Sequence, residues 1–305
     1  MLCNRNMLVG MLATTLCAGA MSCGSSDGAE AAGQGAVTFT TWGEDYIEKE
    51  LPAAPPAAEG IVDGWTVKYS KFLVVIRGVT IADSTGATAA QMAGSVLFDM
   101  HVPGSKDVVQ FPSLPAKSWD RVSYEVGPCD STTVAAPGVD PSDLAMMAAQ
   151  GFSMHVAAEA TRGSDKKTIS WSFKEATRYR DCKAELDGKQ VYGVVVTNGG
   201  NDQVELTIHG DHFFYDDLEA PTAQRRFDAI ACADADDDGA VTLEELSAVS
   251  LLPEPNATDD WCKSRPAYKS GSQPVNDLGA FVRALSRTVG HYRGEGECIS
   301  EKLAQ

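Results

Sequence analysis

An acidic loop near residue 240 carries the residues whose types and spacing most clearly suggest chemistry. Asp234, Asp236 and Asp238 alternate with other residues, Gly239 follows directly, and Glu245 stands at the twelfth position. Calcium takes six to eight hard oxygen ligands, which alternate side chains of a tight loop can supply together. A glycine at the sixth position permits the sharp turn that such a loop needs. The spacing therefore predicts a calcium site.

The twelve residues from 234 to 245 resemble the EF-hand loop. Val241 takes the apolar eighth position, which normally faces a partner loop, but the sequence contains no second loop of this kind. A single loop argues against cooperative sensing, so we interpret the ion as structural. The ligands that the resemblance implies are Asp234, Asp236, Asp238, the Ala240 carbonyl, Thr242 directly or through water, and Glu245 through both oxygens.

Histidines suggest a second metal site in the preceding part of the chain. His209 and His212 lie in an acidic run, while His101 and His155 each lie in a separate strand-like run. Imidazole and carboxylate together suit zinc or copper, so strands that bring these histidines together would form a transition-metal site. In the alternative interpretation the histidines satisfy backbone carbonyls, and Asp216 and Asp217 cap a following helix. The candidate ligands are His209, His212, His101 and His155.

The fifth histidine lies in a glycine-rich stretch that follows the last predicted helix. His291 stands next to Gly290, and Gly294 follows shortly after. A cation is favoured near a helix C-terminus, and glycine lets the chain turn there. We interpret this stretch as structural, with ligand binding as the alternative.

The segment from 37 to 218 alternates β-rich runs with turn residues, and 221–302 changes to helical spacing. The first segment predicts an antiparallel sandwich or barrel with one helix near 140–151, because its runs are rich in β-branched and aromatic residues. The second predicts a small α-helical domain that contains the EF-hand loop. The fold class is therefore mainly β, followed by a helical domain. The β-rich runs are 65–81, 95–102, 107–111, 121–126, 152–160, 168–173 and 204–209.

The N-terminal residues predict export and anchoring. Residues 1–22 have a short charged start, an apolar middle and a small-residue end, as in a signal peptide. The sequence from Ala20 to Cys23 resembles a bacterial lipobox, which implies a lipid on Cys23, and 23–36 predicts a flexible tether. We therefore expect a lipoprotein of the cell envelope at the outer membrane, with free secretion as the alternative.

Five cysteines remain after the signal peptide and the lipid-bearing residue are set aside. An exported compartment permits disulfides. We expect the pairs Cys129–Cys182 and Cys262–Cys298, because each would tie irregular segments of one predicted domain together. Cys232 lies in a helical pattern and is interpreted as a buried free thiol.

Charge and missing motifs exclude several classes of function. The formal net charge of −17 leaves no basic surface for phosphate backbones, so nucleic acid is a poor partner. The sequence has no nucleophile elbow, zinc-protease motif, phosphate loop or dinucleotide fingerprint. We therefore expect a binding or structural protein rather than an enzyme, with an unfamiliar carboxylate hydrolase as a remaining alternative.

The layout of 65–130 loosely resembles periplasmic copper-binding domains of the methanobactin-partner type. A long strand hairpin is followed by a run from Phe98 to His101 and by a second run from Leu114 to Gly127. The resemblance implies a role in carrying or taking up metal, but it transfers no individual ligand.

Overall fold

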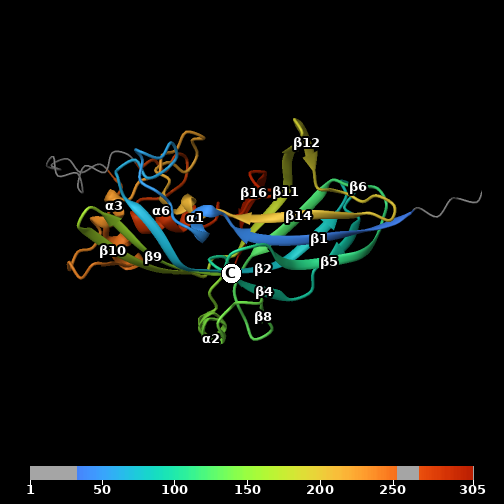
Figure 1. Ribbon diagram of the computed structural model, residues 1–305, viewed down its shortest axis with the longest axis horizontal. Helices are drawn as coiled ribbons and strands as arrows, with labels where there is room; N and C mark the ends of the chain where they lie inside the picture. Colours follow the sequence, from blue (N-terminus) through green and yellow to red (C-terminus); the bar gives the residue numbers. More distant parts are fainter. Residues whose placement is uncertain (1–32, 253–267, 305) are drawn as a thin grey trace, which may run out of the picture. The chain divides into compact units, whose positions relative to one another are not determined.

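The computed structural model describes residues 33–252 and 268–304. The predicted signal peptide, Cys23 and Cys262 lie outside these ranges. The described part of 33–305 clusters as one compact unit, made mostly of strands that form curled sheets (Figure 1). Within the described residues, no helix combines the length and apolar character needed to cross a membrane.

The large sheet is organised around one long strand, β2, which is buried on both faces at its centre. The run from Phe72 to Ile76 is fully buried, because the main core lies on one side and a smaller cluster with Met147 on the other. The strand order is β12-β11-β7-β2-β9-β10-β15, where β15 spans Ala240–Val241. The bounds are β2 (Thr66–Ala82), β3 (Thr88–Gln91), β4 (Ser95–Asp99), β7 (Arg121–Val126), β8 (Val134–Ala135), β9 (Met154–Arg162), β10 (Asp165–Phe173), β11 (Thr177–Leu186) and β12 (Lys189–Tyr192).

The helix that carries Met147 is α2 (Pro141–Gln150), and the structure confirms its prediction. The Asp140 side chain accepts a hydrogen bond from the Ser142 N–H at the first turn, and Gly151 ends the helix with φ of 64°. These are the capping residues that the sequence offers at each end.

A second sheet packs its apolar face into the same core and contains a parallel pair of strands. Val37 and Phe39 of its central strand, β1, are fully buried in that core. β1 runs parallel to β14 and antiparallel to β5, so the expectation of a purely antiparallel arrangement is corrected here. The bounds are β1 (Gln34–Gly43), β5 (Lys106–Pro115) and β14 (Asn201–Ile208), and a further small sheet joins β6 (Ser118–Trp119) to β13 (Val194–Val195).

The segment from 221 onward adds both short helices and strands to this framework. Two of its strands join the large sheet, β15 beside β10 and β16 beside β11, which corrects the expectation of an all-helical segment. Phe227, Leu246 and Phe281 belong to the same core cluster as the strands, so the core does not break at the predicted domain boundary. The bounds are α1 (Asp45–Glu48), η1 (Asp211–Phe214), α3 (Asp228–Ala231), β15 (Ala240–Val241), α4 (Leu243–Ala248), α6 (Leu278–Leu285) and β16 (Glu297–Lys302).

The disulfide connectivity differs from the predicted one. Cys182 is bonded to Cys298, and Cys129 is a buried free thiol, so both predicted pairs, Cys129–Cys182 and Cys262–Cys298, are wrong. The reason is the pairing of β16 with β11, which brings residues far apart in the sequence side by side. Cys232 is disulfide-bonded rather than free.

Candidate functional site

Three histidines meet where β14 ends. His209 follows β14, His212 lies in η1, and His291 follows α6. The ring centroids of His209 and His291 are 4.0 Å apart, and those of His212 and His291 are 4.9 Å apart. One nitrogen from each ring lies within 4.8 Å of the others, so the three can hold one metal ion. His291, which the sequence analysis interpreted as structural, is therefore a candidate ligand.

Backbone pairing brings His291 to this place from the C-terminal segment. The His209 N–H donates to the Val289 carbonyl at 2.8 Å, and the His291 N–H donates to the Thr207 carbonyl at the same distance. Gly290 lies between these bonds, and a Cβ there would stand 2.5 Å from the Tyr124 hydroxyl oxygen. Only glycine permits so close an approach. The glycine before His291 was therefore the feature of the sequence that indicated a close backbone contact at this place.

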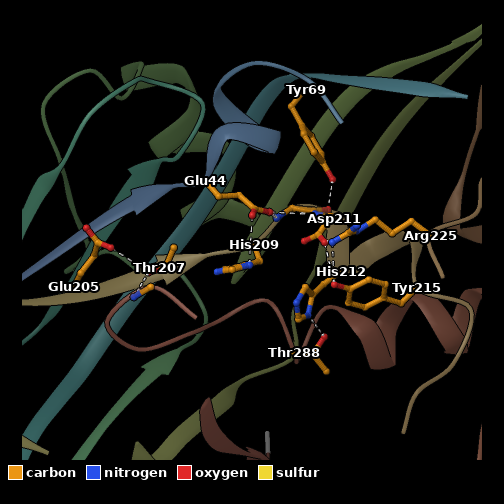
Figure 2. Close-up of polar contacts among 12 residues, drawn as sticks. Glu44, Tyr69, Glu205, Thr207, His209, Asp211, His212, Tyr215, Arg225 and Thr288 are labelled. Atoms are coloured by element: carbon orange, nitrogen blue, oxygen red, sulfur yellow. Dashed lines mark hydrogen bonds and ion pairs between the residues drawn. The ribbon is translucent and has the colours of Figure 1, made fainter. Parts of the chain in front are cut away.

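The hydrogen-bond partners of the ring nitrogens differ among the three histidines. The Thr288 hydroxyl donates to the Leu285 carbonyl, so it accepts from His212 Nδ1 at 2.9 Å and leaves Nε2 as a free acceptor (Figure 2). His209 Nε2 and His291 Nδ1 are buried and make no hydrogen bond of normal geometry, although the Gly294 backbone lies close enough to His209 to raise its pKa. An unpaired buried polar atom costs about 1–3 kcal/mol, so these two atoms require an explanation.

Burial keeps these imidazoles neutral. It lowers the pKa of His212 to about 3, although Asp211 opposes the shift. Burial also lowers the pKa of His209, against the opposing effects of Asp211 and the Gly294 backbone, and it lowers the pKa of His291. Neutral imidazole is the form that binds metal ions.

Two carboxyl groups lie beside His209. β1 and β14 are parallel and pair Gly43 with Ile208, so the next residues, Glu44 and His209, emerge side by side at the carboxyl ends of the two strands. Glu44 Oε2 lies 3.4 Å from His209 Nδ1 (Figure 2). Asp211 comes two residues after His209 in the sequence. One ligand atom each from Glu44, His209 and Asp211 lies within 4.8 Å of the others.

The same carboxyl groups are held by specific donors. Glu44 Oε1 accepts from the Gly210 N–H at 2.8 Å, while Asp211 Oδ2 accepts from Arg225 Nε at 2.6 Å and from the Tyr215 hydroxyl at 3.0 Å. Burial and the neighbouring Asp211 raise the pKa of Glu44 to about 9. Burial alone would raise the pKa of Asp211, but the positive charge of Arg225 and the hydrogen bond with Glu44 hold it below its ordinary value.

These groups line an acidic cavity of about 830 Å³. Arg225 is its basic lining residue and is paired with Asp211. Exposed carboxylates on the lining connect the cavity with the solvent and give it a field that attracts cations. The outer acidic residues are Glu59, Asp217, Glu219, Glu295 and Glu297.

The acidic loop forms a second group of possible metal ligands. Asp234, Asp236 and Glu245 each place a carboxylate oxygen within 4.8 Å of the others. Asp234 Oδ2 accepts from the Gly239 N–H at 3.0 Å and from Lys167, whereas Asp234 Oδ1 is buried without a partner. Gly239 has a φ of 86°, the conformation expected at the turn.

The remaining predicted ligands of the loop are engaged in local hydrogen bonds. Glu245 Oε2 accepts from the backbone N–H and the hydroxyl of Thr242, and Asp238 Oδ1 accepts from the Ala240 N–H at 2.7 Å. Ala240 and Val241 pair with Thr168 and Ile169 of β10. A strand of the large sheet therefore takes the place beside the loop where a second EF-hand loop would lie.

The other predicted metal ligands lie elsewhere. His101 Nδ1 pairs with the Ile47 carbonyl at 2.9 Å, and His155 Nδ1 with the Ser172 hydroxyl at 2.8 Å. Neither belongs to a metal-binding group among the described residues. Asp216 and Asp217 accept hydrogen bonds from the backbone N–H groups of 219, 220 and 224, so they organise the turn that follows η1.

Comparisons with known proteins give little further guidance. No family model matches the chain, and no curated protein matches it. A solved structure, MbnP from Methylosinus trichosporium, is similar at 13% identity and a TM-score of 0.31, covering 65% of this chain and 88% of that one. This weak likeness agrees with the loose resemblance expected from the layout of 65–130, and it carries no argument about the site.

Proposed function

We propose that this protein binds a transition-metal ion, copper or zinc, through His209, His212 and His291. The observation that carries the proposal is the pair of buried nitrogens, His209 Nε2 and His291 Nδ1, that lack hydrogen-bond partners beside His212. A metal ion would satisfy both nitrogens at once, whereas a buried water would need a similar set of partners without explaining three converging rings.

The surroundings suit such an ion. Imidazole is a good ligand for zinc and copper, and three protein ligands leave a further position open. Thr288 and Glu44 contact the Nδ1 atoms of His212 and His209, and outer contacts of this kind fix the tautomer and orientation of a metal-binding ring. All three histidines line the acidic cavity, through which a cation can enter.

The direct test is metal analysis of purified protein after incubation with zinc or copper and removal of excess metal. We expect His291→Ala and His212→Ala each to lose the ion. His155→Ala is the matched control, because His155 is also partly buried and hydrogen-bonded but belongs to no cluster. Equal metal content in wild type, His291→Ala and His155→Ala would rule out this function.

We also propose that the loop from Asp234 to Glu245 binds one calcium ion that stabilises the C-terminal segment. The supporting observation is Asp234, whose Oδ2 is held by Gly239 while its buried Oδ1 is left free. In an EF-hand loop the free oxygen would bind the ion. The hydrogen bonds of Glu245 to Thr242 and Ala235 would then exchange for calcium as the ion enters.

Thermal melting in calcium and in a selective calcium chelator tests this second proposal. Extracellular calcium modules have Kd values of about 10⁻⁴–10⁻³ M. At ten times Kd, a ligand that binds only the folded state adds about 1.4 kcal/mol. We expect a calcium-dependent rise of the melting temperature that the double variant Asp234→Ala, Glu245→Ala lacks and the exposed control Glu244→Ala keeps. No shift in wild type at millimolar calcium would contradict the proposal.

The proposed location is the cell envelope, with the chain anchored by a lipid on Cys23. The support is the lipobox resemblance from Ala20 to Cys23. We expect labelled fatty acid to be incorporated into wild type and not into Cys23→Ala. Incorporation in neither protein would favour a freely secreted form.

A further inference from the structure

We propose that a second divalent transition-metal ion binds between Glu44 and Asp211 and shares His209 with the three-histidine site. This inference rests on the proposed function, because His209 belongs to both positions. The result would be a centre with two ions on opposite nitrogens of one imidazole ring.

Glu44 and Asp211 each have one carboxyl oxygen that accepts hydrogen bonds from neighbouring donors. The other oxygen of each group does not accept from those donors. Gly210 holds Glu44 Oε1, while Arg225 and Tyr215 hold Asp211 Oδ2. Asp211 Oδ1 accepts from no N–H or hydroxyl group, although the Asp211 side chain is only 2% exposed, and in the metal-free protein its partner is the Glu44 carboxyl group. Glu44 Oε2 faces His209 rather than a backbone donor (Figure 2).

His209 has a nitrogen for each position. Its Nδ1 faces Glu44 at 3.4 Å, and its Nε2 is the unpaired atom assigned above to the three-histidine position. An imidazole binds a cation at both nitrogens only as imidazolate. The Nδ1 proton and the proton that the Glu44 and Asp211 carboxyl groups share are therefore both released to solvent when the second ion binds.

Charge favours a cation at this place. Glu44 and Asp211 carry two carboxyl groups against the single guanidinium of Arg225. Two buried carboxyl groups in contact need a positive charge between them, which is either a shared proton or a metal ion. Two carboxylate oxygens and one imidazole nitrogen form a mixed ligand set of the kind that zinc-type ions accept. Both carboxyl groups also line the cavity, so an ion can reach them.

The experiment measures zinc bound per chain at saturation, in millimolar calcium so that the Asp234 loop is occupied. Wild type is expected to bind two zinc ions and Glu44→Gln one. Glu48→Gln is the matched control, because Glu48 is a partly exposed carboxylate in α1 that accepts from the Gly104 N–H and belongs to no metal-binding group among the described residues. It is expected to bind two.

Copper provides a second readout, in which the spectrum of the wild-type protein alone can decide the question. Two Cu(II) ions bridged by one imidazole couple magnetically, so we expect wild type with two equivalents of copper to lose most of its simple electron paramagnetic resonance signal. Glu44→Gln should show the uncoupled signal of one ion. An uncoupled signal in fully loaded wild type would overturn the inference even if Glu44→Gln did not fold.

The outcomes separate this inference from the proposed function. One zinc per chain that is lost in His291→Ala and kept in Glu44→Gln leaves the three-histidine site intact and overturns the second position, with a shared proton between the carboxyl groups. No zinc in wild type overturns both. One zinc that is lost in Glu44→Gln but kept in His291→Ala overturns the shared centre.

Discussion

The three-histidine site and the Asp234 loop bring their candidate metal ligands together in opposite ways. The loop collects charged oxygens from twelve consecutive residues, and most of its hydrogen bonds are local. The histidine site collects neutral nitrogens from two distant segments, and its geometry depends on strand pairing. The difference teaches that a local site can be recognised from spacing, whereas a site assembled from distant segments depends on the register of the sheets.

Removing one imidazole should have the largest effect. His212→Ala is expected to weaken zinc binding more than a hundredfold, because even the loss of an outer contact typically costs 10–100-fold. Calcium binding to the Asp234 loop should be unchanged, since His212 makes no contact there. Competition titration with a zinc chelator measures the zinc affinity, and calorimetry measures calcium binding. A change of less than threefold would show that His212 is not a ligand.

Removing the contact that orients His212 should have a smaller effect at the same site. Thr288→Val removes the hydroxyl that accepts from His212 Nδ1, so we expect a loss of about 10–100-fold in zinc affinity. Thr288→Ser keeps the hydroxyl and should restore most of the affinity. If both variants behave like wild type in the chelator competition, the Thr288 contact does not orient the ring.

The metal-free protein should lose stability in acid because of the buried histidines. The pKa of His212 is lowered to about 3 in the folded state, so the unfolded chain binds more protons between that value and the ordinary histidine value near 6.5. Stability is therefore present above pH 6.5 and falls with pH through this window, by roughly 1 kcal/mol per pH unit for each proton. Urea unfolding at several pH values measures this slope. His212→Gln should have a shallower slope, and an unchanged slope would contradict the assignment.

The smallest expected effect concerns the charge beside the loop. Lys167 contacts Asp234 Oδ2, so its ammonium group repels a cation at the loop by about 1 kcal/mol. Lys167→Met is expected to bind calcium about fivefold more tightly, as measured by calorimetry. Lys166→Met is the control, because Lys166 pairs with Glu159 instead. Weaker binding by Lys167→Met would show that the lysine positions Asp234 more than it repels the ion.

The sequence predicted local features well and distant ones poorly. α2 was predictable because Asp140 and Gly151 mark its ends, and the turn at Gly239 was predictable because the loop spacing requires it. His209 and His212 were recognised together since they are close in the chain. Glu44 was missed because only the parallel pairing of β1 with β14 places it beside His209.

His291 and the disulfide were missed for the same physical reason. The bridge between Ile208 and Gly290 and the pairing of β16 with β11 join segments that carry no complementary pattern in the sequence. Gly290 gave a signal that the backbone approaches another group closely, but the sequence does not identify that group.

The origin of His291 in a late segment would also set the timing of the proposed metal loading. His291 is synthesised after every other residue of the cluster, and its place is fixed only when its backbone pairs with Thr207. A nascent chain that has not reached His291 lacks one of the three ligands, and an unfolded chain does not hold His291 beside His209 and His212. An ion that binds all three histidines would therefore enter after folding, and the compartment in which the chain folds would decide which metal it meets.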